Sequence, residues 1–127
     1  MDRKPFLLKP AAKDYLWGGS RLNDDFSKNI DMQPLAETWE CSVHPDGPSY
    51  VANGIYKGQT LAEVLSAHPE YLGTKVENGE LPVLVKFIDA KKDLSVQVHP
   101  DDAYAREHEG DNGKTEMWYC LLYTSPS

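Results

Sequence analysis

The sequence predicts a mostly β fold, arranged as an antiparallel barrel or sandwich that carries one or two short helices. Two observations favour this class. Residues 36–44 and 93–99 alternate between polar and apolar side chains with the period of two that is typical of β-strands. Turn-forming runs rich in Pro and Gly, such as residues 45–49, separate segments of this kind. A chain of 127 residues is long enough for one modest domain of this class.

The first half of the chain contains two predicted strands and an aromatic turn. Residues 6–9 predict a short strand, and residues 15–22 form an aromatic segment in which we expect Trp17 to pack beside a tight Gly-Gly turn. Residues 23–34 are polar and typical of a loop. The alternation in residues 36–44 places one set of side chains on each face of a strand, with Thr38, Glu40, Ser42 and His44 on one face and Trp39, Cys41 and Val43 on the other.

The second half is predicted to hold one clear helix, further strands and a second short helix. Residues 60–68 show a capping-box pattern, Thr60 with Glu63, and an apolar stripe at helical spacing. Residues 81–89 are rich in β-forming residues and predict a buried strand. The remaining predicted elements are the strand 93–99, a short helix within 101–110 and a last strand at 115–119.

The composition argues against several classes of partner. The net charge of −7 and the pI near 5.0 disfavour binding to nucleic acid, which requires a basic surface. The longest apolar runs, such as residues 81–88, are too short to span a bilayer, and we expect neither a basic membrane-binding patch nor a secretory signal. Only two cysteines occur, Cys41 and Cys120, which fits a reducing compartment. We therefore expect a cytoplasmic protein that binds neither nucleic acid nor membranes.

Polar side chains interrupt the apolar character of the strand predicted at 93–99. Its alternation places Ser95, Gln97 and His99 on one face, and side chains two residues apart can approach one ion. Glu116 on the next predicted strand adds a carboxylate if both strands face a common cavity. An amide oxygen, an imidazole nitrogen and a carboxylate suit Zn²⁺ or a similar divalent metal. Spacing alone is a weak signal, because a lone His on a strand is more often a surface or core residue than a ligand, and Glu116 could be solvated.

Two runs of sequence carry a resemblance that spacing alone does not. "SVQVHPDD" and "GKTEMWY" together resemble the paired signature of type I mannose-6-phosphate isomerases, zinc enzymes of the cupin class. The resemblance extends in order through "LKPAAKDYLWGGSRL", "AETWECSVHPDGPSYVANGIYKGQTLAEVL" and "LPVLVKFIDA", so it covers nearly all of residues 6–119. It implies a cupin-like antiparallel jelly-roll barrel with short helices, incomplete because the chain is truncated, and a Zn²⁺ ion bound by Gln97, His99 and Glu116. The family's fourth ligand, a histidine, lies beyond the last residue of this chain.

The resemblance also implies an activity and roles for neighbouring residues. The family interconverts mannose 6-phosphate and fructose 6-phosphate, so the expected partner is a small sugar phosphate. Lys114 matches an active-site lysine and is the candidate for proton handling, while Ser95 and Lys86 match positions that hold the substrate phosphate. Lys86 is equally consistent with a snorkelling lysine, and Ser95 with a small strand residue. Two other functions stay open, a different metal-dependent cupin enzyme and a non-catalytic module that binds sugar phosphates.

The last eight residues, "CLLYTSPS", differ in character from the rest. They follow a strand pattern without a turn or partner, and they resemble the translated read-through of a transposon adaptor used in sequencing libraries. We expect residues 1–119 to be the N-terminal part of a phosphomannose isomerase cupin domain and residues 120–127 to be a non-native tail. Three ligands leave the metal site incomplete, so we expect the isolated chain to bind zinc weakly and to show little isomerase activity.

Overall fold

The computed structural model describes residues 4–76, 79–94 and 115–121. Its contacts divide the chain into two compact units, Met1–Leu94 and Ser95–Ser127, and each unit is treated by itself below. The first unit contains all the helices and strands found in the described residues. In the second unit, residues 115–121 are exposed and form neither helix nor strand, so the last strand predicted at 115–119 is wrong. The predicted strand 93–99 and the predicted helix in 101–110 fall almost entirely outside the described residues.

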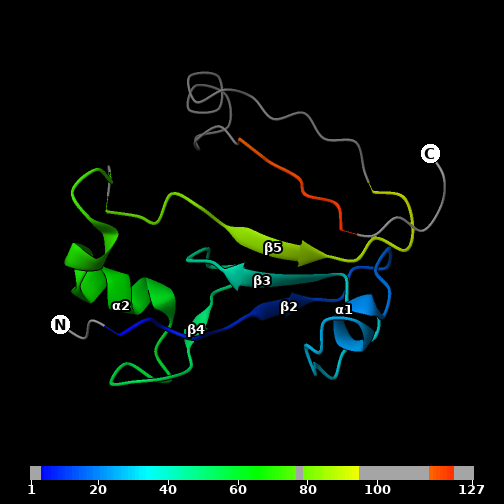
Figure 1. The fold of residues 1–127 in the computed structure, drawn as a ribbon, viewed down its shortest axis with the longest axis horizontal. Coiled ribbons are helices and arrows are strands. Elements are labelled where there is room, and N and C mark those ends of the chain that lie inside the picture. Colours follow the sequence, from blue (N-terminus) through cyan, green and yellow to red (C-terminus); the bar gives the residue numbers. More distant parts are fainter. Residues whose placement is uncertain (1–3, 77–78, 95–114, 122–127) are drawn as a thin grey trace. The chain divides into compact units, whose positions relative to one another are not determined.

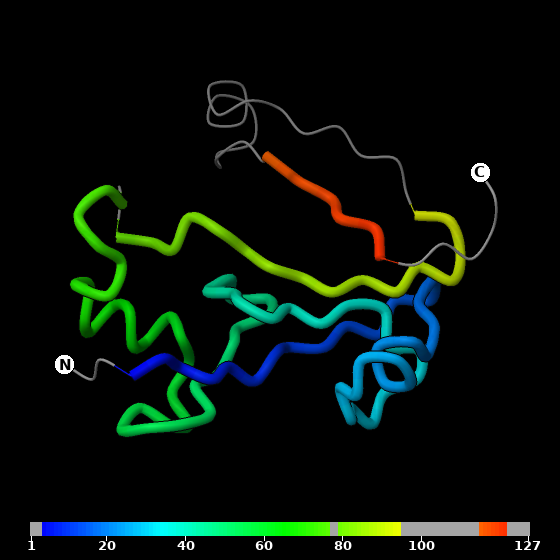
Figure 2. Tube along the Cα trace, viewed as in Figure 1, coloured from blue at the N-terminus to red at the C-terminus, as the bar shows by residue number. Residues whose placement is uncertain are grey.

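A three-stranded antiparallel sheet forms the centre of the first unit (Figure 1). Its strands are β2 (Ala11–Lys13), β3 (Glu37–Cys41) and β5 (Val85–Ile88), in the order β2-β3-β5. Figure 2 shows that these segments, far apart in the sequence, run side by side. The register pairs Trp39 on the central strand with Ala11 on one side and Lys86 on the other. Opposed residues point to the same face of a sheet, so this register decides which side chains can meet.

An apolar core beside the sheet joins the remaining elements of the first unit. A two-stranded antiparallel sheet pairs β1 (Leu8–Lys9) with β4 (Tyr50–Val51), and it is followed along the chain by α2 (Leu61–Ala67) and the 3₁₀ helix η1 (Pro69–Leu72). The buried residues of this core, with the apolar residues packed on them, are Val51, Tyr56, Val64, Phe6, Leu8 and Tyr71. The short helix α1 (Arg21–Asp24) lies at the other end of the sheet (Figure 1). None of the helices in the described parts of the chain is long and apolar enough to cross a membrane.

Helix α2 confirms the capping box predicted from the sequence. The Thr60 hydroxyl accepts a hydrogen bond from the Glu63 backbone N–H at 3.1 Å, and the Glu63 carboxylate accepts one from the Thr60 N–H at 3.3 Å. The predicted apolar stripe is buried, with Leu61, Val64 and Leu65 all facing the core. Both donors at the start of the helix are therefore satisfied by side chains that lie within one turn of each other.

Replacing Thr60 by Ala is expected to lower the free energy of unfolding by about 1 kcal/mol, because the Glu63 N–H loses its acceptor. A urea titration of the chain followed by circular dichroism measures the change. Ser66→Ala, an exposed position on the same helix, is the matched control and should shift stability by much less. Equal stability of Thr60→Ala and the unsubstituted chain would contradict a stabilising role for the capping box.

The mostly β, antiparallel class with short helices is confirmed, but one strand differs from its prediction. Residues 81–89 were expected to form one buried strand, whereas β5 covers only Val85–Ile88. Val83 and Val85 are 55% and 47% exposed. These side chains are exposed because β5 is an edge strand: among the described residues it pairs only with β3. A run of β-forming residues predicts a strand but does not distinguish an edge strand from a central one.

Candidate functional site

Four side chains gather on one face of the three-stranded sheet, and we call them the sheet-face cluster: Lys13, Glu37, Trp39 and Lys86. Glu37 and Trp39 are two residues apart on β3 and therefore share a face. Lys86 on β5 is the cross-strand partner of Trp39, and Lys13 on β2 is the partner of Glu37. Strand register alone thus brings two cations, a carboxylate and an indole together.

Charge and hydrogen bonding connect three members of the sheet-face cluster. The Trp39 indole Nε1–H donates to Glu37 Oε2 at 2.7 Å, and both side chains are at least nine-tenths buried. The Lys86 Nζ lies 3.6 Å from the same Glu37 oxygen and 4.5 Å from the centroid of the Trp39 ring. A buried carboxylate needs such partners, because an unpaired charge away from water is costly.

The Trp39 ring is enclosed by groups from three segments. The Lys13 Nζ lies 4.6 Å from its centroid and donates to the backbone carbonyl of Asp46. The His44 ring meets the indole edge to face, with centroids 5.7 Å apart. Gly47 lies so close that a Cβ there would fall 2.3 Å from Trp39 Cε3, so this position accepts only glycine without a rearrangement. The turn closed by the hydrogen bond from the Gly47 N–H to the His44 carbonyl, which overlaps the turn predicted at residues 45–49, therefore packs on the indole.

An aromatic pair lies beside the sheet-face cluster. The Tyr15 and Trp17 rings stack with centroids 5.5 Å apart and planes 29° apart. Burial raises the pKa of the Tyr15 phenol, and the carboxylates of Glu37, Asp46 and Asp14 raise it further. The phenol therefore stays protonated at neutral pH and can serve as a hydrogen-bond donor. The pair lies within a tight turn that leads into the Gly-Gly segment and is closed by a hydrogen bond from the Gly18 N–H to the Tyr15 carbonyl at 3.0 Å.

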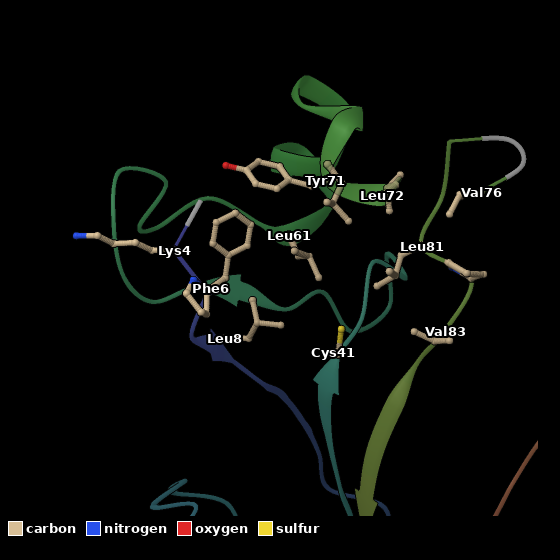
Figure 3. A pocket seen from close by; sticks show the side chains of 13 residues that line it. Lys4, Phe6, Leu8, Cys41, Leu61, Tyr71, Leu72, Val76, Leu81 and Val83 are labelled. Atoms are coloured by element: carbon tan, nitrogen blue, oxygen red, sulfur yellow. The ribbon is translucent and has the colours of Figure 1, made fainter. Parts of the chain in front are cut away.

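A large groove in the first unit has a different, apolar character (Figure 3). It has a volume of about 700 Å³. Its walls come from the N-terminal segment, the end of β3, α2, η1 and the segment leading into β5. The residues that line it include Phe6, Leu8, Cys41, Leu61, Tyr71, Leu72, Leu81 and Val83. Burial raises the pKa of the Cys41 thiol, which makes it a poor nucleophile and a poor metal ligand at neutral pH. The charged groups of the site gather on the sheet face instead.

Comparison with known proteins assigns the chain to a family. The family described as phosphomannose isomerase type I, catalytic domain, matches residues 6–123. The chain belongs to the type I phosphomannose isomerase family. The resemblance carried by the sequence motifs is thereby confirmed.

Two mannose-6-phosphate isomerases and one crystal structure illustrate how similar the chain is to its relatives. The mannose-6-phosphate isomerase of Streptococcus mutans is 45% identical over 118 residues, which cover 93% of this chain and 37% of that protein. The mannose-6-phosphate isomerase ManA of Bacillus subtilis is 45% identical over 122 residues, covering 95% of this chain and 38% of that protein. A crystal structure of the mannose 6-phosphate isomerase from Bacillus subtilis matches with a TM-score of 0.80 at 46% identity, over 87% of this chain and 35% of that one. The chain thus spans less than two-fifths of the length of these isomerases.

The phosphomannose isomerase residues predicted from the sequence are only partly covered by the structure. Lys86 lies in the sheet-face cluster, half-buried as its side chain's 25% exposure shows. Glu116 lies in the second unit and is exposed. The other predicted site residues fall outside the described residues, namely Ser95, Gln97, His99 and Lys114. The zinc ligand set therefore stays a prediction, since Glu116 is its one member within the described residues.

Glu37 is not among the site residues that the sequence predicts. Glu40 lies on the opposite face of β3, where it forms an ion pair with Lys28 and accepts a hydrogen bond from the Thr38 hydroxyl at 2.8 Å. The signal for Glu37 was present in the alternation, since Glu37 shares a face with Trp39 whereas Glu40 does not. His44 and His68 each have a ring partner in the structure, Trp39 and Tyr56 respectively.

Proposed function

We propose that the protein is a mannose-6-phosphate isomerase that interconverts mannose 6-phosphate and fructose 6-phosphate with a bound zinc ion. The observation that carries this proposal is the match of residues 6–123 to the catalytic domain of the type I phosphomannose isomerase family. The sheet-face cluster supports it, because Lys86 offers an ammonium group of the kind that a phosphate dianion requires.

The reaction removes a proton from a carbon next to a carbonyl and returns a proton to the adjacent carbon. In this proposal, Gln97, His99 and Glu116 hold the zinc ion. When bound, zinc supplies Lewis-acid polarisation of the sugar oxygens. Lys114 handles the transferred proton or stabilises the negative charge that develops at the enediol oxygens.

The phosphate end of the substrate is assigned to two residues of this chain. Ser95 donates a hydroxyl hydrogen bond to a phosphate oxygen, and Lys86 supplies the opposing charge. Both contacts are the same in the aldose and the ketose, because the phosphate does not change during the reaction. They therefore anchor either sugar while the proton moves at the other end of the molecule.

A chimaera tests the proposed function. Residues 6–119 replace the matching portion of the Bacillus subtilis isomerase, and turnover of mannose 6-phosphate is measured in a coupled assay together with metal content by mass spectrometry. We expect turnover and zinc, and we expect little turnover from the 127-residue chain alone. A chimaera that folds and binds mannose 6-phosphate without turnover would indicate a binding module, and iron with a different activity would indicate another metal-dependent enzyme.

The remaining assignments belong to the same proposal. We place the enzyme in the cytoplasm, which the low cysteine content supports, and we expect a small sugar phosphate as its partner. We also propose that residues 1–119 are the N-terminal part of the isomerase domain and that residues 120–127 are a non-native tail. Sequencing the source gene by a second library chemistry tests the tail, and recovery of the same eight residues would contradict it.

A further inference from the structure

Trp39 contacts Lys86 in two ways at once. The indole ring lies under the Lys86 ammonium, with Nζ 4.5 Å from the centroid, which is within the range of a cation–π interaction. The indole N–H also fixes the carboxylate of Glu37 at 2.7 Å, and that carboxylate lies 3.6 Å from the same ammonium. The three side chains therefore form a closed set in which each touches the other two.

A lysine needs such support if it is to act as a fixed cation. Its four-carbon stem has many rotamers, and holding one of them costs conformational entropy. A ring face below Nζ and a carboxylate beside it both favour the rotamer that extends along the sheet face. The cross-strand pairing of Trp39 with Lys86 sets the two backbones at the distance from which this contact is made.

Trp39 is itself held more firmly than Lys86. It is 8% exposed, whereas the Lys86 side chain is 25% exposed. Gly47 closes one side of the ring, and the Lys13 ammonium lies 4.6 Å from the centroid. A buried ring that is packed on several sides has essentially one rotamer, so the Trp39 ring offers the Lys86 ammonium a fixed surface to pack against.

The contact with Glu37 leaves the Lys86 ammonium able to bind an anion. Its separation of 3.6 Å is longer than the roughly 2.7–2.9 Å of a direct charge-assisted hydrogen bond. An ammonium group has three N–H donors, and the ring face uses none of them as a conventional hydrogen bond. A phosphate oxygen can therefore take a shorter bond than the one that Glu37 makes.

We infer that Trp39 is a positioning residue, which holds the Lys86 ammonium in place for the substrate phosphate through its ring face and through Glu37. This inference rests on the proposed function. Positioning before binding reduces the entropy lost when the phosphate arrives, so it acts on substrate affinity and leaves the proton transfer largely unchanged.

The test is Trp39→Phe in the chimaera, which keeps an aromatic ring and removes the N–H donor to Glu37. We expect KM for mannose 6-phosphate to rise about tenfold, the size of one lost hydrogen bond to a charged group, and kcat to stay within about twofold. In a Lys86→Met background, Trp39→Phe should change KM by less than about twofold, because the positioned group is already absent. Tyr56→Phe, another buried aromatic that loses a polar group, is the control for stability loss and should leave KM unchanged.

A second measurement does not depend on turnover. Side-chain NMR relaxation of labelled lysine in the chimaera should show Lys86 becoming more mobile in Trp39→Phe, with exposed Lys57 unchanged. An unchanged KM, an equal rise in KM in the Lys86→Met background, or an unchanged Lys86 mobility would each overturn the inference. An unsubstituted chimaera without turnover would instead overturn the proposed function, and the mobility measurement would still decide whether Trp39 holds Lys86.

Discussion

Replacing His99 by Ala in the chimaera is expected to remove most of the bound zinc and to abolish measurable isomerase turnover. Removing a residue that hydrogen-bonds to a metal ligand costs roughly 10–100-fold in metal affinity or activity. Removing the ligand itself should cost more. The physical reason is that an imidazole nitrogen is the strongest neutral donor in the proposed set, and alanine offers no donor in its place. Metal content by mass spectrometry and turnover of mannose 6-phosphate measure the two effects separately.

His108→Ala is the matched control for this experiment. The same type of residue is removed nearby in the sequence, at a position that lies in none of the family motifs. We expect this variant to keep its zinc and its turnover. If His99→Ala also kept normal zinc and normal turnover, the proposed ligand set of Gln97, His99 and Glu116 would be refuted.

Replacing Gly18 by Ala is expected to lower the free energy of unfolding by about 3 kcal/mol, at the upper end of what overpacking usually costs. A Cβ at this position would lie 2.5 Å from the Cα of Ala36, which no side-chain movement can relieve. Ala36 is fully buried, and its backbone N–H and carbonyl are bonded to Lys13 and Asp89 at 2.8 Å. Moving Ala36 aside would therefore disturb the pairing of the central strand. Urea unfolding of the chain followed by circular dichroism measures the loss.

Gly58→Ala separates this steric effect from the conformational preference of glycine. Gly58 has a φ of +91°, and a Cβ added there would meet no heavy atom within 4 Å, so alanine meets backbone strain without a clash. Such strain costs roughly 1–2 kcal/mol. We expect Gly18→Ala to be the more destabilising of the two, and the reverse order would show that the close approach of Gly18 to Ala36 contributes little to stability.

The elements that the sequence predicted well are those whose determinants are local. Helix α2 has its cap and its apolar stripe within nine residues, and both are found as expected. The strand β3, Glu37–Cys41, lies within the predicted strand 36–44 but covers only its first part. The neighbours of β3 depend on pairing between distant segments, for which the period of two gives no information. The exposure of the segment leading into β5 was missed for the same reason.

The candidate site was predictable to a smaller extent. Lys86 came from the family resemblance, and its partners Glu37 and Trp39 emerge only once the register of β3 and β5 is known. Alternation shows that Glu37 and Trp39 share a face, but it does not show that the carboxylate is buried or that the indole N–H donates to it. Such facts depend on what covers the face, including the turn around Gly47. The predicted zinc ligands remain a prediction of the resemblance.

The strand order β2-β3-β5 also has a consequence for the time at which the sheet-face cluster forms during synthesis. Trp39 pairs with Ala11 on one side and with Lys86 on the other. Ala11 is synthesised before Trp39, whereas Lys86 is synthesised after α2 and η1. A nascent chain can build the local contacts of α2 early, but the loop between β3 and β5 must close before Lys86 reaches the indole. The ribosome therefore releases the parts of this cluster in an order that makes Lys86 the last to arrive.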